Sequence, residues 1–179
     1  MKLTIKRLEV RDIGAAVMLL RQLFNESESD DQHYPIMDDV EMDAMAMIML
    51  QTIDSPQALY LIAYDGKKPI GVFIGEICQR AYGRPRVFGV ARDLYVVPDK
   101  RGQNVGMKML AIAGQYAKAI GLDTIETIAR PGKAQGRWEK YGFKPYLVNS
   151  VMKVQDARAV RGAPVTSQQH PPEPQRAMA

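Results

Sequence analysis

The chain has 179 residues, of which 46% are hydrophobic and 25% are charged, a balance typical of one soluble globular domain. This composition excludes a wholly disordered chain, a collagen and a coiled-coil rod. No apolar run approaches the about 20 residues that span a bilayer, and the alternating start MKLTIKRLEV does not resemble a signal peptide. We therefore expect a cytoplasmic protein without a membrane partner. The single Cys78 and two histidines predict neither an intrachain disulfide nor a metal site.

The formal net charge of +4 is unevenly distributed along the chain. Eight acidic residues, and no lysine or arginine, lie between Asn25 and Asp43, so the rest of the chain is basic. This segment is either a solvated acidic loop or a region that attracts a cationic ligand. The basic residues are scattered, the aromatic content is 7% and no recognition helix is evident, which argues against a nucleic-acid partner.

The hydrophobic periodicity predicts strands and helices in turn. A strand is expected over residues 3–10, and a helix from an N-cap at Asp12 to about Asn25, followed by an acidic loop over 26–39. A methionine-rich helix over 40–52 suits either core packing or a partner surface. Three strands are then predicted over 58–64, 69–78 and 87–97, with a hairpin turn at Asp65-Gly66 between the first two.

The second half of the chain continues this alternation. A helix over 105–120 ending at Gly121, a strand over 124–129, a short helix over 133–141 and a last strand over 143–154 are predicted. This order indicates an α+β fold in which helices cover a mixed sheet. From Gln155 the pattern ends, and the Pro- and Gln-rich segment 155–179 is expected to be a flexible or partner-bound tail. The predicted domain therefore spans residues 1–154.

The stretch from Asp93 to Gly106 combines a strand, a proline, a basic glycine-bearing turn and the start of a helix. Helix N-termini bind anions, because their first N–H groups are unpaired and the helix dipole is positive there. Gly102 and Gly106 let the backbone approach a ligand closely. The stretch is therefore a candidate pyrophosphate cradle, although it lacks the GxxxxGK[ST] and GxGxxG motifs of other nucleotide-binding folds.

Two runs of residues carry a resemblance to a known family. Leu94-x-Val96-x-Pro98-Asp99-x-Arg101-Gly102-x-x-Val105-Gly106 resembles the acyl-CoA-binding motif of the GNAT superfamily of N-acetyltransferases. Ala134-x-x-x-Trp138-Glu139-Lys140-Tyr141-Gly142-Phe143 resembles the late helix of that family and the Gly-Phe that follows it. The predicted element order is also similar to the family fold, a mostly antiparallel mixed sheet with a splayed central strand pair and helices on both faces.

The resemblance implies transfer of an acetyl group from acetyl-CoA to a primary amine by direct attack, with no metal. It implies that the strand backbone pairs with the pantetheine arm and that the following turn holds the pyrophosphate. It also implies that the Val96 N–H stabilises the oxyanion of the tetrahedral intermediate. The cofactor-binding residues implied in this way are Leu94, Tyr95, Val96, Val97, Arg101, Gly102, Gln103, Asn104, Val105, Gly106, Lys108 and Trp138.

Three positions depart from the family pattern. Asn104 stands where the loop usually carries a second glycine, and asparagine is the non-glycine residue best suited to positive φ. Trp138 stands where a tyrosine often serves as general acid, and an indole N–H is too weak an acid for that role. Either Tyr141 or water is the alternative proton donor. Pro131 replaces an asparagine that commonly contacts the cofactor, and it offers no N–H.

Asp93 and Glu76 are the candidate general bases. Asp93 precedes the cofactor-binding run, and its alternative role is a salt bridge with a neighbour such as Arg92. Glu76 lies on the adjacent predicted strand and faces either the cleft or solvent. The acidic segment 26–43 falls in a region that forms part of the family's acceptor site. It therefore predicts a cationic acceptor such as a polyamine, an aminoglycoside or a lysine-rich peptide.

A second hypothesis is a catalytically degenerate member of the fold. It is motivated by Asn104, Pro131 and Trp138, which replace functional residues of the family. The methionine-rich helix and the tail would then be contact surfaces in a homodimer or in a larger assembly, for example a viral particle. Cofactor binding without turnover would favour this alternative.

Overall fold

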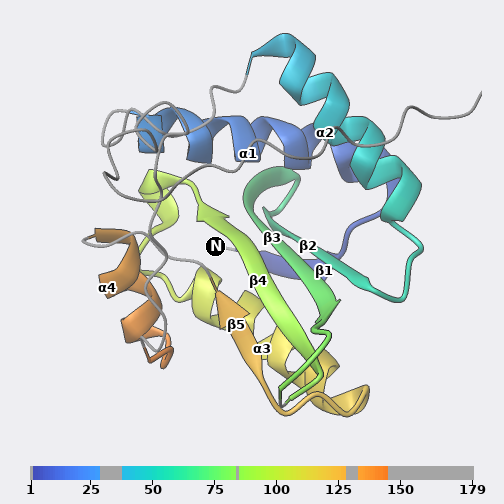
Figure 1. The fold of residues 1–179 in the computed structure, drawn as a ribbon. Coiled ribbons are helices and arrows are strands. Elements are labelled where there is room, and N and C mark those ends of the chain that lie inside the picture. The colour runs from blue at the N-terminus through green and yellow to red at the C-terminus, as the bar shows by residue number, and fades with distance from the viewer. Residues whose placement is uncertain (1, 29–37, 84, 128–132, 145–179) are drawn as a thin grey trace, which may run out of the picture. The chain divides into compact units, whose positions relative to one another are not determined.

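The computed structural model describes residues 2–28, 38–83, 85–127 and 133–144. The strands of this part of the chain form one sheet whose order follows the chain, β1-β2-β3-β4-β5 (Figure 1). They are β1 (Leu3–Arg7), β2 (Ala58–Asp65), β3 (Lys68–Gln79), β4 (Val87–Val96) and β5 (Ile125–Thr127). The helices are α1 (Ile13–Glu28), α2 (Asp39–Thr52), α3 (Val105–Ala119) and α4 (Lys133–Lys140), with 3-10 helices η1 (Val10–Asp12) and η2 (Pro98–Lys100).

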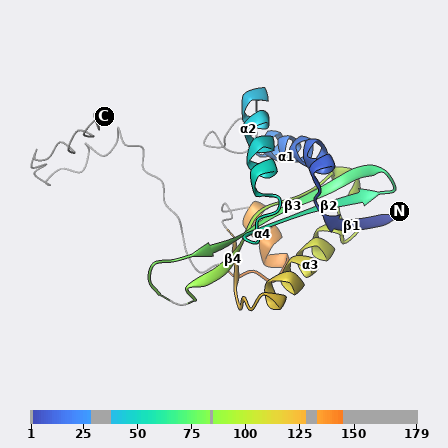
Figure 2. The ribbon, with the colours of Figure 1, turned by 90° about the vertical axis from the view of Figure 1, so that its right-hand side faces the viewer.

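Strands β1 to β4 pair antiparallel with their neighbours, whereas β5 pairs parallel to β4. Helices α1 and α2 lie on one face of this sheet, and α3 and α4 lie on the other (Figure 2). The predicted α+β fold with a mixed, mostly antiparallel sheet is therefore confirmed. None of the described helices combines the length and apolar character needed to cross a bilayer.

The hydrophobic core lies on both faces of β2 and β3, the central strands. Six consecutive residues of each strand are buried, in β2 from Ala58 and in β3 from Ile70, because helices cover both sides. Leu20 of α1 and Met109 of α3 are each fully buried, one on each side of the sheet. The sheet is thus held from both faces, and this arrangement fixes the strands that carry the candidate site.

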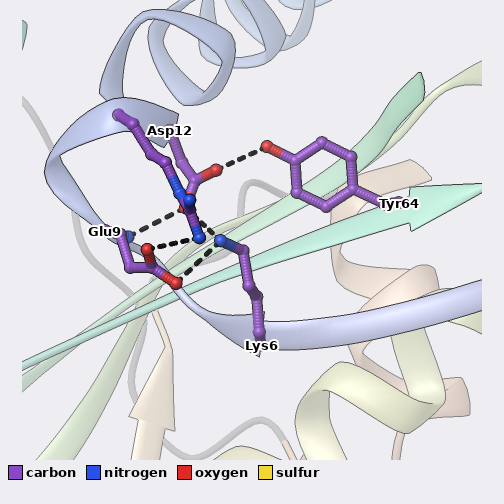
Figure 3. A network of polar contacts seen from close by, with 5 residues as sticks. Lys6, Glu9, Asp12 and Tyr64 are labelled. Atoms are coloured by element: carbon purple, nitrogen blue, oxygen red, sulfur yellow. Dashed lines mark hydrogen bonds and ion pairs between the residues drawn. The ribbon is translucent and has the colours of Figure 1, made fainter. Parts of the chain in front are cut away.

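A polar network joins the start of α1 to β1 and β2 (Figure 3). The Asp12 carboxylate, only 5% exposed, accepts hydrogen bonds from Lys6 Nζ at 2.7 Å, the Tyr64 hydroxyl at 2.7 Å and the Glu9 N–H at 3.0 Å. Burial opposes ionisation of Asp12, but the hydrogen bonds from Lys6 and Tyr64 outweigh it and lower its pKa. The prediction that Asp12 is the N-cap of α1 is wrong, because Asp12 is the third residue of η1, whose N-cap is Glu9, and its side chain accepts the N–H of Glu9, which lies before it.

Several predicted boundaries shift in the structure. Strand β1 ends at Arg7, and α1 continues to Glu28, so Glu26 and Glu28 are helical and not in the predicted loop. The turn at Asp65-Gly66 is confirmed, with Gly66 at φ 62°. Phe143 and Lys144 are not in a strand. The rest of the predicted last strand, the boundary at 154 and the tail lie outside the described residues.

Candidate active site

An irregularity in the pairing of β3 with β4 marks the centre of the candidate site. Ile74 pairs with Asp93, whereas the next residue, Gly75, pairs with Ala91. Arg92 is therefore an extra residue in β4, which makes a β-bulge. A bulge twists its strand locally and redirects the side chains beside it.

The two candidate bases lie on the same face of the sheet. Asp93 stands opposite Ile74, and Glu76 follows Ile74 by two residues, so the alternation of side chains places both carboxylates on one face. Tyr95, two residues after Asp93, shares this face, and its hydroxyl contacts α1. The structure therefore brings Asp93 and Glu76 together on the side of the sheet that α1 and α2 cover.

The environments of the two carboxylates differ. Glu76 is held by Arg92, whose Nε lies 2.8 Å from Glu76 Oε2. Within the described residues, the salt bridge of Arg92 joins Glu76 and not Asp93. Burial raises the pKa of Asp93 to about 6, the nearby Arg92 charge lowers it, and the Glu76 charge raises it. Asp93 can therefore exchange a proton near neutral pH, as a general base must.

Beyond the bulge, two residues of β4 face an edge that no described strand covers, which we call the uncovered edge. The Val97 N–H donates to a carbonyl of β3 at 3.0 Å, which places Leu94 and Val96 at the non-hydrogen-bonded positions of this pairing. Their N–H and C=O groups therefore point away from β3, toward the side of β5. The described part of β5 pairs with β4 only at Gly89–Ala91. Leu94 and Val96 thus have the geometry to pair with an extended ligand, whereas Tyr95 and Val97 direct their backbone groups to β3.

The turn between β4 and α3 has the backbone geometry of an anion cradle. Gly102 has φ 80° and Asn104 has φ 61°, so both lie in the left-handed region. The expectation that Asn104 preserves the turn is confirmed. Helix α3 begins at Val105, and its first N–H groups have no partner within the helix. Two left-handed residues in this turn, one of them directly before a helix N-terminus, form a site that suits a pyrophosphate.

The polar side chains around this turn contact the protein itself. Lys100 Nζ lies 2.7 Å from Asp65 Oδ2, which fastens the turn to the β2–β3 hairpin. Gln103 Nε2 donates to the Asp99 carbonyl at 3.2 Å. Lys108 is exposed on the first turn of α3. The contacts at Lys100 and Gln103 order the turn, and the exposed Lys108 leaves positive charge at its surface.

Tyr141, just beyond the end of α4, borders the cradle. The Tyr141 hydroxyl lies so close to Gly106 that a Cβ on this glycine would be 2.9 Å from it. The Leu94 side chain borders the same point at 3.6 Å. Trp138 meets Tyr141 edge to face, with ring centroids 6.1 Å apart, and meets Phe143 at 5.0 Å. Tyr141 thus brings a hydroxyl to the start of α3, whereas Trp138 packs among aromatic rings.

The acidic segment 26–43 is only partly described. Asp38 accepts the Glu41 N–H at 2.9 Å and caps α2, and Asp39 pairs with Arg21 of α1 at 3.2 Å. Residues 29–37, which include His33, Asp30 and Asp31, lie outside the described residues. Asp38 and Asp39 therefore stabilise α1 and α2, and attraction of a cationic acceptor stays a prediction.

Two residues of this region escape recognition from the sequence. The bulge at Arg92 depends on the register with β3, for which the local sequence carries no signal. Glu26 falls in a predicted loop, because the apolar periodicity of α1 ends at Phe24. No group of three or more His, Cys, Asp or Glu side chains able to hold a metal occurs in the described ranges.

Comparison with known proteins adds independent findings. A family model described as an acetyltransferase (GNAT) domain matches residues 56–145. No curated protein sequence matches the chain significantly. Similar solved structures include a predicted acetyltransferase with acetyl-CoA from Clostridium acetobutylicum (16% identity, TM-score 0.71, covering 86% of this chain and 97% of that one). They also include an aminoglycoside antibiotic 6'-N-acetyltransferase from Acinetobacter baumannii (15%, 0.66, 84% and 97%) and a glucosamine-6-phosphate N-acetyltransferase from Arabidopsis thaliana (15%, 0.64, 86% and 99%).

Proposed function

The chain belongs to the GNAT acetyltransferase family, and from this premise we propose that it transfers an acetyl group from acetyl-CoA to a primary amine. The acceptor class comprises small cationic amines and the lysine or N-terminal amines of proteins. The observation that carries the proposal is the Asp93 carboxyl, whose pKa burial raises to about 6, on the strand that also presents the uncovered edge. A titratable carboxyl beside an extended binding edge suits proton removal from an amine.

The residues of the candidate site fit acetyl-CoA as the donor. Leu94 and Val96 direct backbone groups to the uncovered edge, where the pantetheine arm would pair. The turn at Gly102 and Asn104, with the start of α3, would hold the pyrophosphate. When bound, acetyl-CoA supplies a thioester that an amine can attack. The Val96 N–H, which points to this edge, is the donor proposed for the developing charge on the carbonyl oxygen.

Proton transfers are assigned to two side chains of this chain. Asp93 takes the proton of the acceptor ammonium, directly or through water, because its carboxylate is available above about pH 6. Glu76 is paired with Arg92, so Asp93 is the better base of the two. Tyr141, whose hydroxyl borders Gly106, is the proposed proton donor to the leaving thiolate. The aminoglycoside and glucosamine-phosphate acetyltransferases with this fold support an amine acceptor.

The test is thiol release from acetyl-CoA with a panel of primary amines, for the wild type, Asp93→Asn and the exposed control Asp123→Asn. We expect an acid limb in the kcat/KM profile with an apparent pKa near 6. Asp93→Asn should remove this limb and lower the rate by roughly 10²–10⁴-fold, whereas Asp123→Asn should not. An unchanged limb in Asp93→Asn would assign the base to another residue such as Glu76. Binding of acetyl-CoA without turnover of any amine would favour the catalytically degenerate alternative.

A further inference from the structure

One carboxylate joins the end of α1 to the cofactor turn. Glu26 Oε1 accepts the Tyr95 hydroxyl at 2.6 Å, and Glu26 Oε2 accepts Arg101 Nη2 at 2.6 Å. Arg101 Nε donates to the Val96 carbonyl at 2.9 Å. The Arg101 guanidinium also lies 5.4 Å from the centre of the Tyr95 ring. Gln22, one turn earlier on α1, lies 3.3 Å from the same hydroxyl. Arg101 is thus held by contacts with both α1 and β4.

The Tyr95 hydroxyl keeps Glu26 in place. Burial and the hydrogen bond to Glu26 raise the pKa of Tyr95 well above its usual range, so the hydroxyl stays a donor. The Tyr95 side chain is 3% exposed and cannot move without disturbing the core. Glu26 therefore accepts from a rigid donor on one oxygen, and its other oxygen faces Arg101.

These contacts occupy groups that the donor would use. The Val96 carbonyl points to the uncovered edge of β4, where the pantetheine arm would pair. The Arg101 charge, next to the turn, would attract the pyrophosphate, but the Glu26 carboxylate neutralises it. We propose that Glu26 is a positioning residue that holds Arg101 on the Val96 carbonyl, and that donor binding displaces Arg101 from Glu26. This inference rests on the proposed function, because its ligand is the donor.

The size of the effect follows from the exposure of the pair. The side chains of Arg101 and Glu26 are 38% and 37% exposed, and ion pairs of this kind are weak. Removing the Glu26 charge should therefore tighten binding of an anionic donor by about fivefold. Loss of any acid in this region also raises the local potential, and that general effect requires a control. Glu41 is an exposed acid on α2, and Glu41→Gln removes the same charge without touching Arg101.

The experiment measures the dissociation constant of CoA by calorimetry for the wild type, Glu26→Gln and Glu41→Gln, after thermal melts confirm that each variant folds. CoA is the probe because its binding requires no turnover. We expect Glu26→Gln to bind CoA about fivefold more tightly than Glu41→Gln does. In an Arg101→Gln background, adding Glu26→Gln should change the affinity for CoA no more than adding Glu41→Gln does. In kinetics, the KM for acetyl-CoA should fall while kcat stays unchanged.

The outcomes separate this inference from the proposed function. If the wild type binds CoA and turns over, but Glu26→Gln equals Glu41→Gln or binds more weakly, only the inference fails. The inference also fails alone if the Glu26→Gln effect persists in the Arg101→Gln background. If Glu26→Gln binds CoA and the wild type does not, the inference stands in its strongest form. If neither binds CoA, the donor site of the proposed function and the inference fail together.

Discussion

The raised pKa of Asp93 predicts that the folded protein loses a measurable amount of stability as the pH rises. Its pKa rises from 3.8 to about 6, mainly because the carboxyl is buried. Since the folded state then binds its proton more tightly than the unfolded state, stability falls as the pH rises from about 4 to about 6. Two pKa units correspond to about 3 kcal/mol. Asp93→Asn carries no charge and should therefore stabilise the protein by up to about 3 kcal/mol at about pH 8.

The assay is urea or thermal unfolding of the wild type and Asp93→Asn at about pH 8 and about pH 4. In a chain of this size, 3 kcal/mol raises the melting temperature by roughly 6–12 °C. The advantage of the variant should vanish at about pH 4, where the wild-type carboxyl is protonated in the folded state. The exposed Asp123→Asn serves as the matched control. A difference of the same size at both pH values would refute the reasoning, because it would come from packing and not from charge.

Three further predictions concern the cradle and the start of α1. Gly114→Ala should stabilise α3 by about 1 kcal/mol, whereas Gly106→Ala should not, because the new Cβ at position 106 would lie 2.9 Å from the Tyr141 hydroxyl. Tyr141→Phe should restore the stability of Gly106→Ala in thermal melts. Equal shifts of the melting temperature for the two glycine substitutions would contradict this contact. Asn104→Ala should cost about 1 kcal/mol more than Asn104→Gly in urea unfolding, because φ is 61°, and equal costs would mean that the turn is not left-handed. Asp12→Asn should cost about 2 kcal/mol at neutral pH. Because the folded-state pKa of Asp12 is lowered, this loss of stability should fade as the pH drops below about 4 and through that pKa. An undiminished loss in strong acid would count against the Lys6 contact.

The order of the elements could be predicted because it depends on local patterns. Apolar alternation located the strands. Asp65-Gly66 marked a turn and Gly121 marked a helix end, and the φ values of 62° at Gly66 and 78° at Gly121 confirm both. Asp12 shows the limit of this approach. A short acidic residue before an apolar run is typical of an N-cap. Its carboxylate instead binds Tyr64, 52 positions away, and no local pattern carries that information.

The candidate site likewise has parts that the local sequence predicts and parts that it does not. The turn before α3 could be predicted because its residues are consecutive and resemble a family motif, and the positive φ of Gly102 and Asn104 agrees with that prediction, whereas cofactor binding there stays a prediction. The partners of Arg92 and Arg101 could not be predicted, because they come from β3 and α1. The position of Tyr141 could not be predicted either, because it lies just beyond α4, which ends at Lys140, and its hydroxyl borders Gly106, 35 positions earlier in the chain.

The sheet order β1-β2-β3-β4 has a consequence for how the protein folds. Strands β2 and β3 are joined by a tight turn, so their pairing is local, whereas β1 must bring Leu3 to Asp65. Loop closure favours the local pairs, and we expect the β2–β3–β4 meander to assemble first. Both candidate carboxylates would then sit on a nascent sheet that is still in water. Asp93 would acquire its raised pKa only when α1 packs over the meander, so the folding step that covers this face would also raise the pKa of the candidate base.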